Sequence, residues 1–431
     1  MKEERRRTKP LRVGLVGCGV VGGGVAEALL QKSPPWDAGS GVPLIELARV
    51  ADVRWADALV PKALRCSDIS EIMNDESIDV VVELVGGTTF AYTVIDRALS
   101  AGKNVVTANK ALLAERGDAL FAKAKKMNKD IAFEAAVAGG IPILDAIRSG
   151  LAANRIEKVF GILNGTTNYI LTKMAETGQS FDSALKSAQE LGFAEADPTL
   201  DVEGIDAAHK IHLLAALALG RRIPMKRIPV QGIRSVSAMD ISYAEQLGCR
   251  IKLLAVAKRI GDGIEISVAP TLVPSAHPLA NVNNELNGVF VQGELVGEAL
   301  FVGRGAGRYP TASAVISDLI DLARVPRGGY VARMTGASTA RPVPAEDYHS
   351  RYYLRITAAD RPGVLAAVTG ILGRAGISIA SVVQLERQSP DEPVPVALLT
   401  HESTAARMAK AVMRINKLPV VKAKTVVFPV V

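Results

Sequence analysis

The chain has 431 residues, of which 48% are hydrophobic and 22% are charged, and its formal net charge at pH 7 is +7. This length is enough for two or three domains with their own cores, and no uninterrupted apolar run is long enough to cross a bilayer. Aromatic residues make up only 4% of the chain and are not interleaved with basic ones, which argues against a nucleic-acid-binding protein.

The N-terminal ten residues carry five basic and two acidic side chains, which gives this tail a net charge of +3. The tail has no apolar stretch and does not resemble a signal peptide, so we expect a cytoplasmic protein that does not enter a membrane. Three cysteines, Cys18, Cys66 and Cys249, lie far apart and form no Cys-x-x-Cys motif. Neither a disulfide framework nor a zinc site is therefore indicated.

Residues 11–22 predict a short apolar strand that runs into a Gly-x-Gly-x-x-Gly loop, and a helix is predicted from Val25 to Leu30. In such a loop Gly17 makes the tight turn, Gly19 lets the backbone approach a pyrophosphate, and Gly22 lets helix and strand pack closely. The alternative is a glycine-rich turn without a ligand, but the strand and helix around the motif favour a dinucleotide-binding fold. The residues expected at the cofactor are Gly17, Gly19, Val20, Val21 and Gly22.

The second strand is predicted at residues 44–51, and it ends in Asp52-Val53-Arg54. An acidic residue at this position binds the ribose 2′-hydroxyl of NAD, whereas an arginine accepts the 2′-phosphate of NADP. Both types are present here. The sequence favours NADP through Arg54 and leaves NAD open.

Two further parallel strands are predicted at residues 79–85 and 104–107. Ligands of open α/β sheets bind outside the carboxyl ends of the strands. We therefore expect Thr88 and Lys110, which follow these strands, to contact the nicotinamide half of the cofactor or the substrate.

Residues 133–142 place Glu134 before a glycine-rich bend. Glu134 and the exposed carbonyls of this bend could hold a hard cation through oxygen. A plain strand-to-helix turn, with Pro142 opening a helix over 143–149, explains the same residues and is favoured by the sequence alone. The segment 159–171 then predicts a strand, an Asn-Gly turn and a threonine-capped helix.

The segment from Gly192 to Lys210 gathers five carboxylates and one lysine ahead of an apolar helix, which is predicted from Val202 to Gly220. Asp206 and Lys210 lie one turn apart on one face of this helix. A solvated ion pair is one interpretation. The apolar turns that follow favour a buried acid and base, which is a common arrangement for proton transfer.

Beyond this helix, strands are predicted at 251–258 and 264–268, and residues 303–312 lead into a helix that ends at Ala323. Residues 326–349 are rich in Pro, Gly, Arg, Ser and Thr, which indicates a linker. The final 80 residues or so predict strand, helix, two strands, helix and strand. An Asp-Arg-Pro-Gly-Val-Leu segment at 360–365 begins the first of these helices.

Three motifs together resemble the homoserine dehydrogenase family in its long bacterial form: residues 107–110, 161–171 and 188–210. The C-terminal βαββαβ order resembles an ACT domain. The resemblance implies a Rossmann NAD(P)-binding domain at 1–134 and an α+β substrate and dimerisation domain at 135–325, with residues 300–325 packing back on the first domain. It also implies a linker at 326–350 and a ferredoxin-like ACT domain at 351–431.

By this resemblance the protein reduces L-aspartate 4-semialdehyde reversibly to L-homoserine, in the biosynthesis of threonine, methionine and isoleucine. Lys210 is expected to be the proton donor, Glu195 to hold the amino end of the substrate, and Asp201 and Asp206 to shape and charge the pocket. Lys110 is expected to contact both nicotinamide and substrate. A monovalent cation, usually sodium, is expected at Glu134 and the carbonyls of Val137, Gly139 and Ile141.

The resemblance also implies a homodimer or homotetramer, and an ACT domain that binds L-threonine as an effector. A structural or dimerising ACT domain without an effector stays open. Another alternative is a catalytically inactive amino-acid-sensing protein, but Lys210 and Glu195 are both retained. An aspartate-semialdehyde dehydrogenase would need a cysteine nucleophile with a histidine base, and neither Cys66 nor Cys249 lies in a supporting motif.

Overall fold

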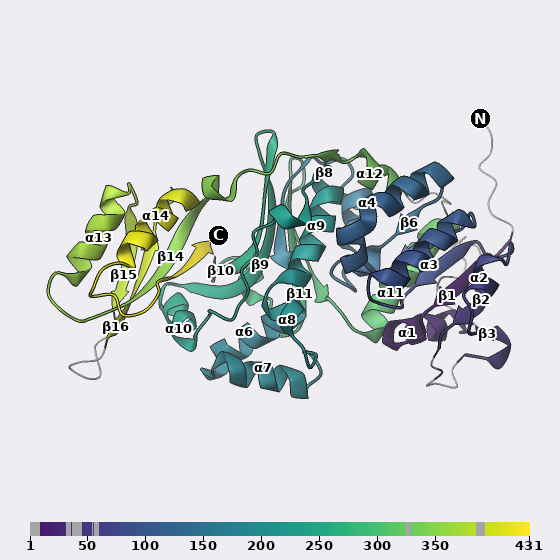
Figure 1. The fold of residues 1–431 in the computed structure, drawn as a ribbon, viewed down its shortest axis with the longest axis horizontal. Helices are drawn as coiled ribbons and strands as arrows, with labels where there is room; N and C mark the ends of the chain where they lie inside the picture. The colour runs from purple at the N-terminus through teal and green to yellow at the C-terminus, as the bar shows by residue number, and fades with distance from the viewer. Residues whose placement is uncertain are drawn as a thin grey trace. The chain divides into compact units, whose positions relative to one another are not determined.

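The computed structural model describes residues 9–31, 36, 45–53, 55, 60–324, 329–384 and 393–431 (Figure 1). The chain forms two compact units. The first contains residues 1–159, 209–225 and 287–340, and the second contains residues 160–208, 226–286 and 341–431. In the part of the chain that is described, no helix is long and apolar enough to span a membrane.

The first unit is built on a six-stranded parallel sheet with the order β3-β2-β1-β4-β5-β6. The strands are Leu11–Val16 (β1), Ile45–Ala51 (β2), Arg65–Cys66 (β3), Val80–Glu83 (β4), Asn104–Thr107 (β5) and Ile131–Ala132 (β6). Their valine- and isoleucine-rich runs are buried on both faces, as in sheets covered by helices on each side. The order confirms the expected Rossmann fold, in which ligands bind where the strand order reverses, here between β1 and β4.

Helices pack in pairs around this sheet: α1 (Val20–Leu29) contacts α11 (Arg308–Arg324), and α3 (Thr89–Ser100) contacts α4 (Lys110–Met127). The first unit also contains β11 (Leu286–Gly293) and β12 (Gly297–Arg304). A short helix α5 (Ile143–Asp145) continues into a π-helical turn at Ala146–Gly150.

The expected linker is more ordered than its composition indicates. Residues 329–340 form α12 (Tyr330–Gly336), which contacts α4, and β13 (Ser338–Thr339), which pairs with β8 (Arg221–Arg222). The Tyr330 ring is 1% exposed and anchors the helix. Val331, Met334 and Ala337 are buried as well, so this short helix docks with an apolar face.

The second unit contains the run of strands β9-β10-β18-β14-β16-β15. These strands are Cys249–Ile260 (β9), Gly263–Pro274 (β10), His349–Ala358 (β14), Ile379–Gln384 (β15), Val394–Thr400 (β16) and Val426–Val430 (β18). The last strand is antiparallel to β14 and parallel to β10, where the Val431 amide donates to the Leu272 carbonyl at 3.0 Å. The helices are α6 (Gly165–Thr177), α7 (Phe181–Glu190), α8 (Thr199–Val202), α10 (Ala238–Gln246), α13 (Val364–Arg374) and α14 (Ala405–Ile415).

The C-terminal part confirms the predicted βαββαβ order, as β14, α13, β15, β16, α14 and β18. One apolar cluster fills its interior, with Leu354, Leu372 and Leu398 fully buried. A buried carboxylate ties it to the rest of the unit. Asp240 of α10 accepts hydrogen bonds from Arg355 Nε at 2.6 Å and Tyr353 Oη at 3.0 Å, both on β14.

The helix predicted from Val202 begins three residues later, at Ile205. α8 ends at Val202, and α9 spans Ile205–Leu219. Gly204 lies between them with φ +81°, a left-handed conformation that side chains rarely adopt. A Cβ atom there would lie 3.1 Å from Val230 Cγ1 and 3.2 Å from Val268 Cγ1. Packing against these two valines therefore fixes the break.

Candidate functional site

The glycine loop after β1 has the geometry expected of a pyrophosphate cradle. Gly17 has φ +95°, and its amide donates to the Ala51 carbonyl at 2.9 Å. A Cβ atom on Gly22 would lie 2.0 Å from the Gly17 carbonyl oxygen, whereas a Cβ atom on Gly19 would meet nothing within 4 Å. Gly19 is the N-cap of α1 and makes no side-chain cap, so the helix N-terminus is open to an anion.

The acidic residue after β2 is attached to this loop. Asp52 Oδ2 accepts a hydrogen bond from the Cys18 amide at 2.5 Å. The carboxylate therefore helps to hold the glycine loop, in addition to any contact with a ribose. Arg54, the residue expected to favour NADP, lies outside the described residues.

A buried carboxylate joins the ends of β4 and β5, where Thr88 and Lys110 were predicted to act. Glu83 is 0% exposed and accepts hydrogen bonds from Thr107 Oγ1 at 2.6 Å and the Val85 amide at 2.9 Å. Burial raises the pKa of its carboxyl, although these hydrogen bonds oppose the change. Sequence reasoning missed Glu83, and the signal available was one acid within an apolar strand.

Asn109 completes this edge of the sheet. Its Nδ2 donates to the Gly87 carbonyl at 2.7 Å, and its Oδ1 accepts from the Leu112 amide at 3.1 Å as the N-cap of α4. Lys110 is the first residue of α4, and Thr88 is the residue before α3. Thr88 and Lys110 thus lie at helix starts whose preceding segments are linked by the hydrogen bonds of Glu83 and Asn109.

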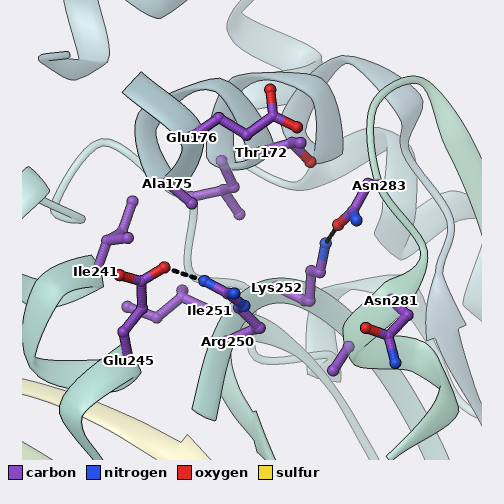
Figure 2. A pocket seen from close by; sticks show the side chains of 12 residues that line it. Thr172, Ala175, Glu176, Ile241, Glu245, Arg250, Ile251, Lys252, Asn281 and Asn283 are labelled. Carbon is purple, nitrogen blue, oxygen red and sulfur yellow. Dashed lines mark hydrogen bonds and ion pairs between the residues drawn. The ribbon is translucent and has the colours of Figure 1, made fainter. Parts of the chain in front are cut away.

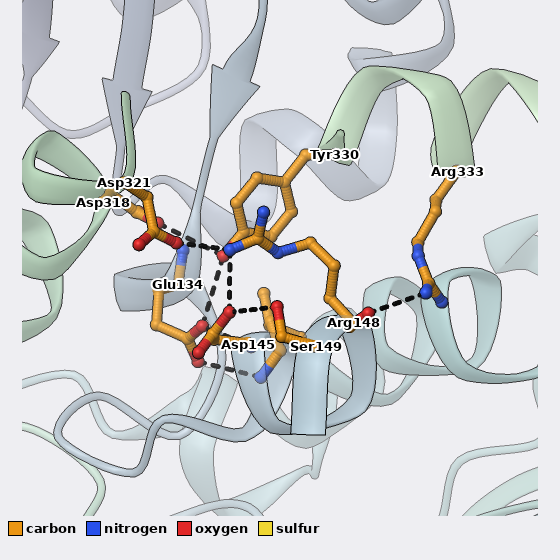
Figure 3. Close-up of polar contacts among 9 residues, drawn as sticks. Glu134, Asp145, Arg148, Ser149, Asp318, Asp321, Tyr330 and Arg333 are labelled. Carbon is orange, nitrogen blue, oxygen red and sulfur yellow. Dashed lines mark hydrogen bonds and ion pairs between the residues drawn. The ribbon is translucent and has the colours of Figure 1, made fainter. Parts of the chain in front are cut away.

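In the bend after β6, backbone amides hold the Glu134 carboxylate in place (Figure 3). Glu134 is 2% exposed, and its two carboxylate oxygens accept hydrogen bonds from the Leu144 amide at 2.8 Å and the Asp145 amide at 2.7 Å. The carboxylate thereby caps the N-terminus of α5. Burial raises its pKa to about 7, against the lowering effect of these hydrogen bonds.

The carbonyls of the same bend differ in their contacts. Ile141 O accepts from the Ile143 amide at 2.7 Å, whereas no described residue donates to the carbonyl of Val137 or Gly139. Ala138 and Gly139 have φ of 56° and 50°, so the chain turns sharply here. Among the described residues, no cluster of three His, Cys, Asp or Glu side chains could bind a metal.

Tyr330 of α12 bridges Glu134 to a second buried acid. Its hydroxyl lies 3.2 Å from Glu134 Oε2 and 3.2 Å from Asp318 Oδ1. Burial, and the charge of Glu134, raise the pKa of the Asp318 carboxyl well above its usual range. Because a phenol has one hydrogen to donate, one of the two carboxyls must carry a proton for both hydrogen bonds to form.

The acidic segment before α9 is organised by Asn164. Its Nδ2 donates to Asp201 Oδ1 at 2.7 Å and to Asp206 Oδ2 at 2.9 Å. Its Oδ1 accepts from the Thr167 amide at 2.8 Å, so the cap of α6 is this asparagine and not a threonine as predicted. One side chain thus starts α6 and brings the two predicted carboxylates together.

Asp206 and Lys210 lie one turn apart on α9 and are 8% and 7% exposed. This burial rules out the solvated surface pair that the sequence left open. Glu195 lies in the exposed loop before α8, where its carbonyl accepts from Gln189 Nε2 at 3.2 Å.

The ACT part contains a small cavity of about 60 Å³ beside the loop between β14 and α13. Asp360 and Arg361 of the predicted Asp-Arg-Pro-Gly-Val-Leu segment line it, together with Ile356, Val364 and Gln384.

Comparisons with known proteins agree with this architecture. The sequence matches the family described as "Homoserine dehydrogenase, NAD binding domain" at residues 17–134, "Homoserine dehydrogenase" at 142–320 and "ACT domain" at 352–420. It is 44% identical to a homoserine dehydrogenase of Pseudomonas aeruginosa, over 95% of this chain and 96% of that protein. It is 40% identical to one of Bacillus subtilis, over 96% of each chain.

Solved structures give the same result. A homoserine dehydrogenase from Thiobacillus denitrificans superposes with a TM-score of 0.92 at 42% identity, covering 98% of both chains. A hyperthermophilic archaeal homoserine dehydrogenase in complex with NADPH superposes with a TM-score of 0.61 at 28% identity, over 72% of this chain and 97% of that one.

Proposed function

The chain belongs to the homoserine dehydrogenase family of oxidoreductases, and from this premise we propose which of its residues carry out the reaction. The reaction is the reversible reduction of L-aspartate 4-semialdehyde to L-homoserine. The nicotinamide cofactor supplies or accepts the hydride. The protein then has to align the substrate and exchange one proton at its oxygen.

Lys210 is the proposed proton donor. Its ammonium stabilises negative charge on the substrate oxygen and transfers a proton to it, directly or through one water. Asp206, one turn earlier, and Asp201 hold negative charge around the amine, and Asn164 fixes both carboxylates. Glu195 binds the substrate amino group, and Lys110 contacts nicotinamide and substrate. The observation that carries this proposal is that Asn164 donates hydrogen bonds to both Asp201 and Asp206. Asp206 and Lys210 are both buried on α9.

Lys210→Ala tests the assignment. Turnover should fall about a hundredfold or more, which is the usual contribution of a positioned acid, with cofactor affinity nearly unchanged. The matched control is Lys186→Ala on α7, whose side chain is 78% exposed. Turnover close to that of an active wild type in Lys210→Ala would contradict the proposal. A wild-type protein without dehydrogenase activity would instead favour the alternative of an amino-acid sensor.

For the cofactor we propose NADP, with NAD as a weaker substrate. The open N-terminus of α1 fits a pyrophosphate, and the archaeal relative of known structure was solved with NADPH. Initial rates with both cofactors, for the wild type and Arg54→Ala, test this. A kcat/KM for NADP that does not change in Arg54→Ala would remove Arg54 from the cofactor site.

We also propose a monovalent cation, sodium, at the bend after β6, bound by the carbonyls of Val137, Gly139 and Ile141. Glu134, whose carboxylate caps α5 and holds the bend, completes this set of oxygen ligands. Sodium chloride should raise the melting temperature more than tetramethylammonium chloride at equal ionic strength. Equal melting temperatures in the two salts would argue against the site.

Finally, we propose a homodimer or homotetramer whose ACT part binds L-threonine next to Asp360 and Arg361. Analytical ultracentrifugation measures the number of subunits in the assembly. Inhibition by millimolar threonine in both reaction directions, lost in Arg361→Ala, would support the effector. Unchanged rates would favour an ACT part that serves structure alone.

A further inference from the structure

A second cavity, of about 270 Å³, lies in the second unit between α6, α10, β9 and the 3-10 turn Pro278–Asn281 (Figure 2). Its polar lining residues are Thr172, Glu176, Glu245, Arg250, Lys252, Asn281 and Asn283. None of the residues proposed for catalysis, cofactor binding or the ACT effector lines it. Its volume lies just below the range of about 300–1,000 Å³ that is typical of ligand pockets, so only a small ligand fits it.

Lys252 is the unusual member of this lining. The residue is 3% exposed, and its Nζ donates to Asn168 Oδ1 at 3.1 Å, Val282 O at 2.7 Å and Asn283 Oδ1 at 3.0 Å. All three acceptors are uncharged. In the part of the chain that is described, no carboxylate forms an ion pair with it, whereas Lys258 on the same strand pairs with Glu265 at 2.9 Å.

Burial lowers the pKa of Lys252 to about 8, so the amine is still mostly charged at neutral pH. A buried ammonium without an opposite charge is unfavourable, and natural proteins usually pair such groups. The Asn283 side chain, at the cavity wall in Figure 2, is an acceptor that an incoming anion can replace.

The other charges of the lining complement this one. Arg250 and Glu245 form an ion pair with each other on one side of the cavity, as Figure 2 shows. Glu176 lies on α6 at the opposite wall, where Lys173 contacts it at 2.7 Å from outside the cavity. Between these charges the wall is apolar, with Leu171, Ala175, Ile241, Ile251 and Ala280.

We propose that this cavity binds a small aliphatic α-amino acid, with its carboxylate at Lys252, its ammonium at Glu176 and its side chain against the apolar wall. The ligand places a negative charge in contact with Lys252, whereas Glu176 of the protein acts on this amine without forming an ion pair with it. The site is separate from the catalytic residues and from the ACT cavity, and it does not depend on the roles proposed for either.

Ligand-detected NMR on the full-length protein tests the site with L-valine and two matched probes. Isovalerate lacks the amino group of valine, and isobutylamine lacks the carboxylate. The wild type should bind L-valine best, isovalerate more weakly and isobutylamine not measurably. Lys252→Met should weaken L-valine binding about tenfold or more, as expected for the loss of a charge-assisted hydrogen bond. Lys258→Met, on the same strand but outside the cavity, should leave it unchanged.

Two further variants keep Lys252 in place, so the test does not depend on whether Lys252→Met folds. Ala175→Phe should fill the cavity and abolish binding, and Glu176→Gln should remove the preference for L-valine over isovalerate. Melting curves check that each variant is folded. Absence of L-valine binding to the wild type, or equal affinity in wild type and Ala175→Phe, would overturn the proposal. Equal binding of isovalerate and L-valine to the wild type would overturn its assignment to an amino acid.

Discussion

Glu134→Gln should flatten the pH dependence of stability, because the buried Glu134 carboxyl takes up its proton more readily in the folded protein than in the unfolded chain. Its pKa is raised from 4.5 to about 7, mainly by burial. A pKa difference of one corresponds to about 1.4 kcal/mol, so this rise is worth about 3 kcal/mol. Glutamine mimics the protonated carboxyl and does not titrate.

Whether the free energy of unfolding rises or falls with pH depends on which state, folded or unfolded, binds more protons. Between about pH 4.5 and pH 7 the folded protein keeps the proton that the unfolded chain has lost. The stabilisation from Glu134 is therefore complete below about pH 4.5, decreases as the pH rises, and is absent above about pH 7. The free energy of unfolding of the wild type should fall by about 3 kcal/mol more over this range than that of Glu134→Gln.

Equilibrium urea denaturation of both proteins from about pH 4.5 to pH 8 measures this difference. Glu190→Gln on α7, whose side chain is 66% exposed, is the matched control and should follow the wild-type curve. The reasoning is refuted if Glu134→Gln keeps the wild-type slope, since another group would then carry the dependence. It is also refuted if the slope difference has the opposite sign.

Three other substitutions follow from the contacts described. Gly22→Ala should weaken cofactor binding at least tenfold, because its Cβ would lie 2.0 Å from the Gly17 carbonyl oxygen. Fluorescence titration measures the cofactor affinity, and Gly373→Ala, whose Cβ would lie in open space, is the control. Asp240→Asn should lower the free energy of unfolding by about 3 kcal/mol or more, since it leaves Arg355 partly buried without its charge partner; a variant with wild-type stability would show that the pair is dispensable. Asn164→Ala should lower kcat with little change in KM for the cofactor, because Asp201 and Asp206 lose their shared partner. The lost helix cap should also lower the free energy of unfolding by about 1 kcal/mol. An unchanged kcat in steady-state kinetics would contradict the positioning role of Asn164.

The Rossmann strands and the glycine loop could be predicted because their signals are local. The apolar strand, the turn and the start of α1 all lie within about 20 residues, and each glycine has a requirement that its neighbours impose. The ACT order was predictable for the same reason, since its strands and helices alternate in short, clearly bounded segments. The structure and the family comparisons confirm both predictions.

Features that depend on distant contacts could not be predicted. The break at Gly204 interrupts a continuous apolar period, and it is set by Val230 and Val268 on other segments. The docking of α12 includes the hydrogen bond between Tyr330 and Glu134, which lie 196 positions apart in the sequence. Asn164 was noted only as part of a polar cluster, because its two carboxylate partners lie 37 and 42 positions later.

The place of β18 in the sheet has a consequence for biosynthesis. This strand consists of residues 426–430 of 431, yet it lies between β10 and β14. Both neighbours leave the ribosome earlier, each with an edge that can pair with the wrong partner. The second unit can close this sheet only after β18 itself has left the ribosome. A nascent chain that stops before β18 should therefore aggregate or recruit chaperones.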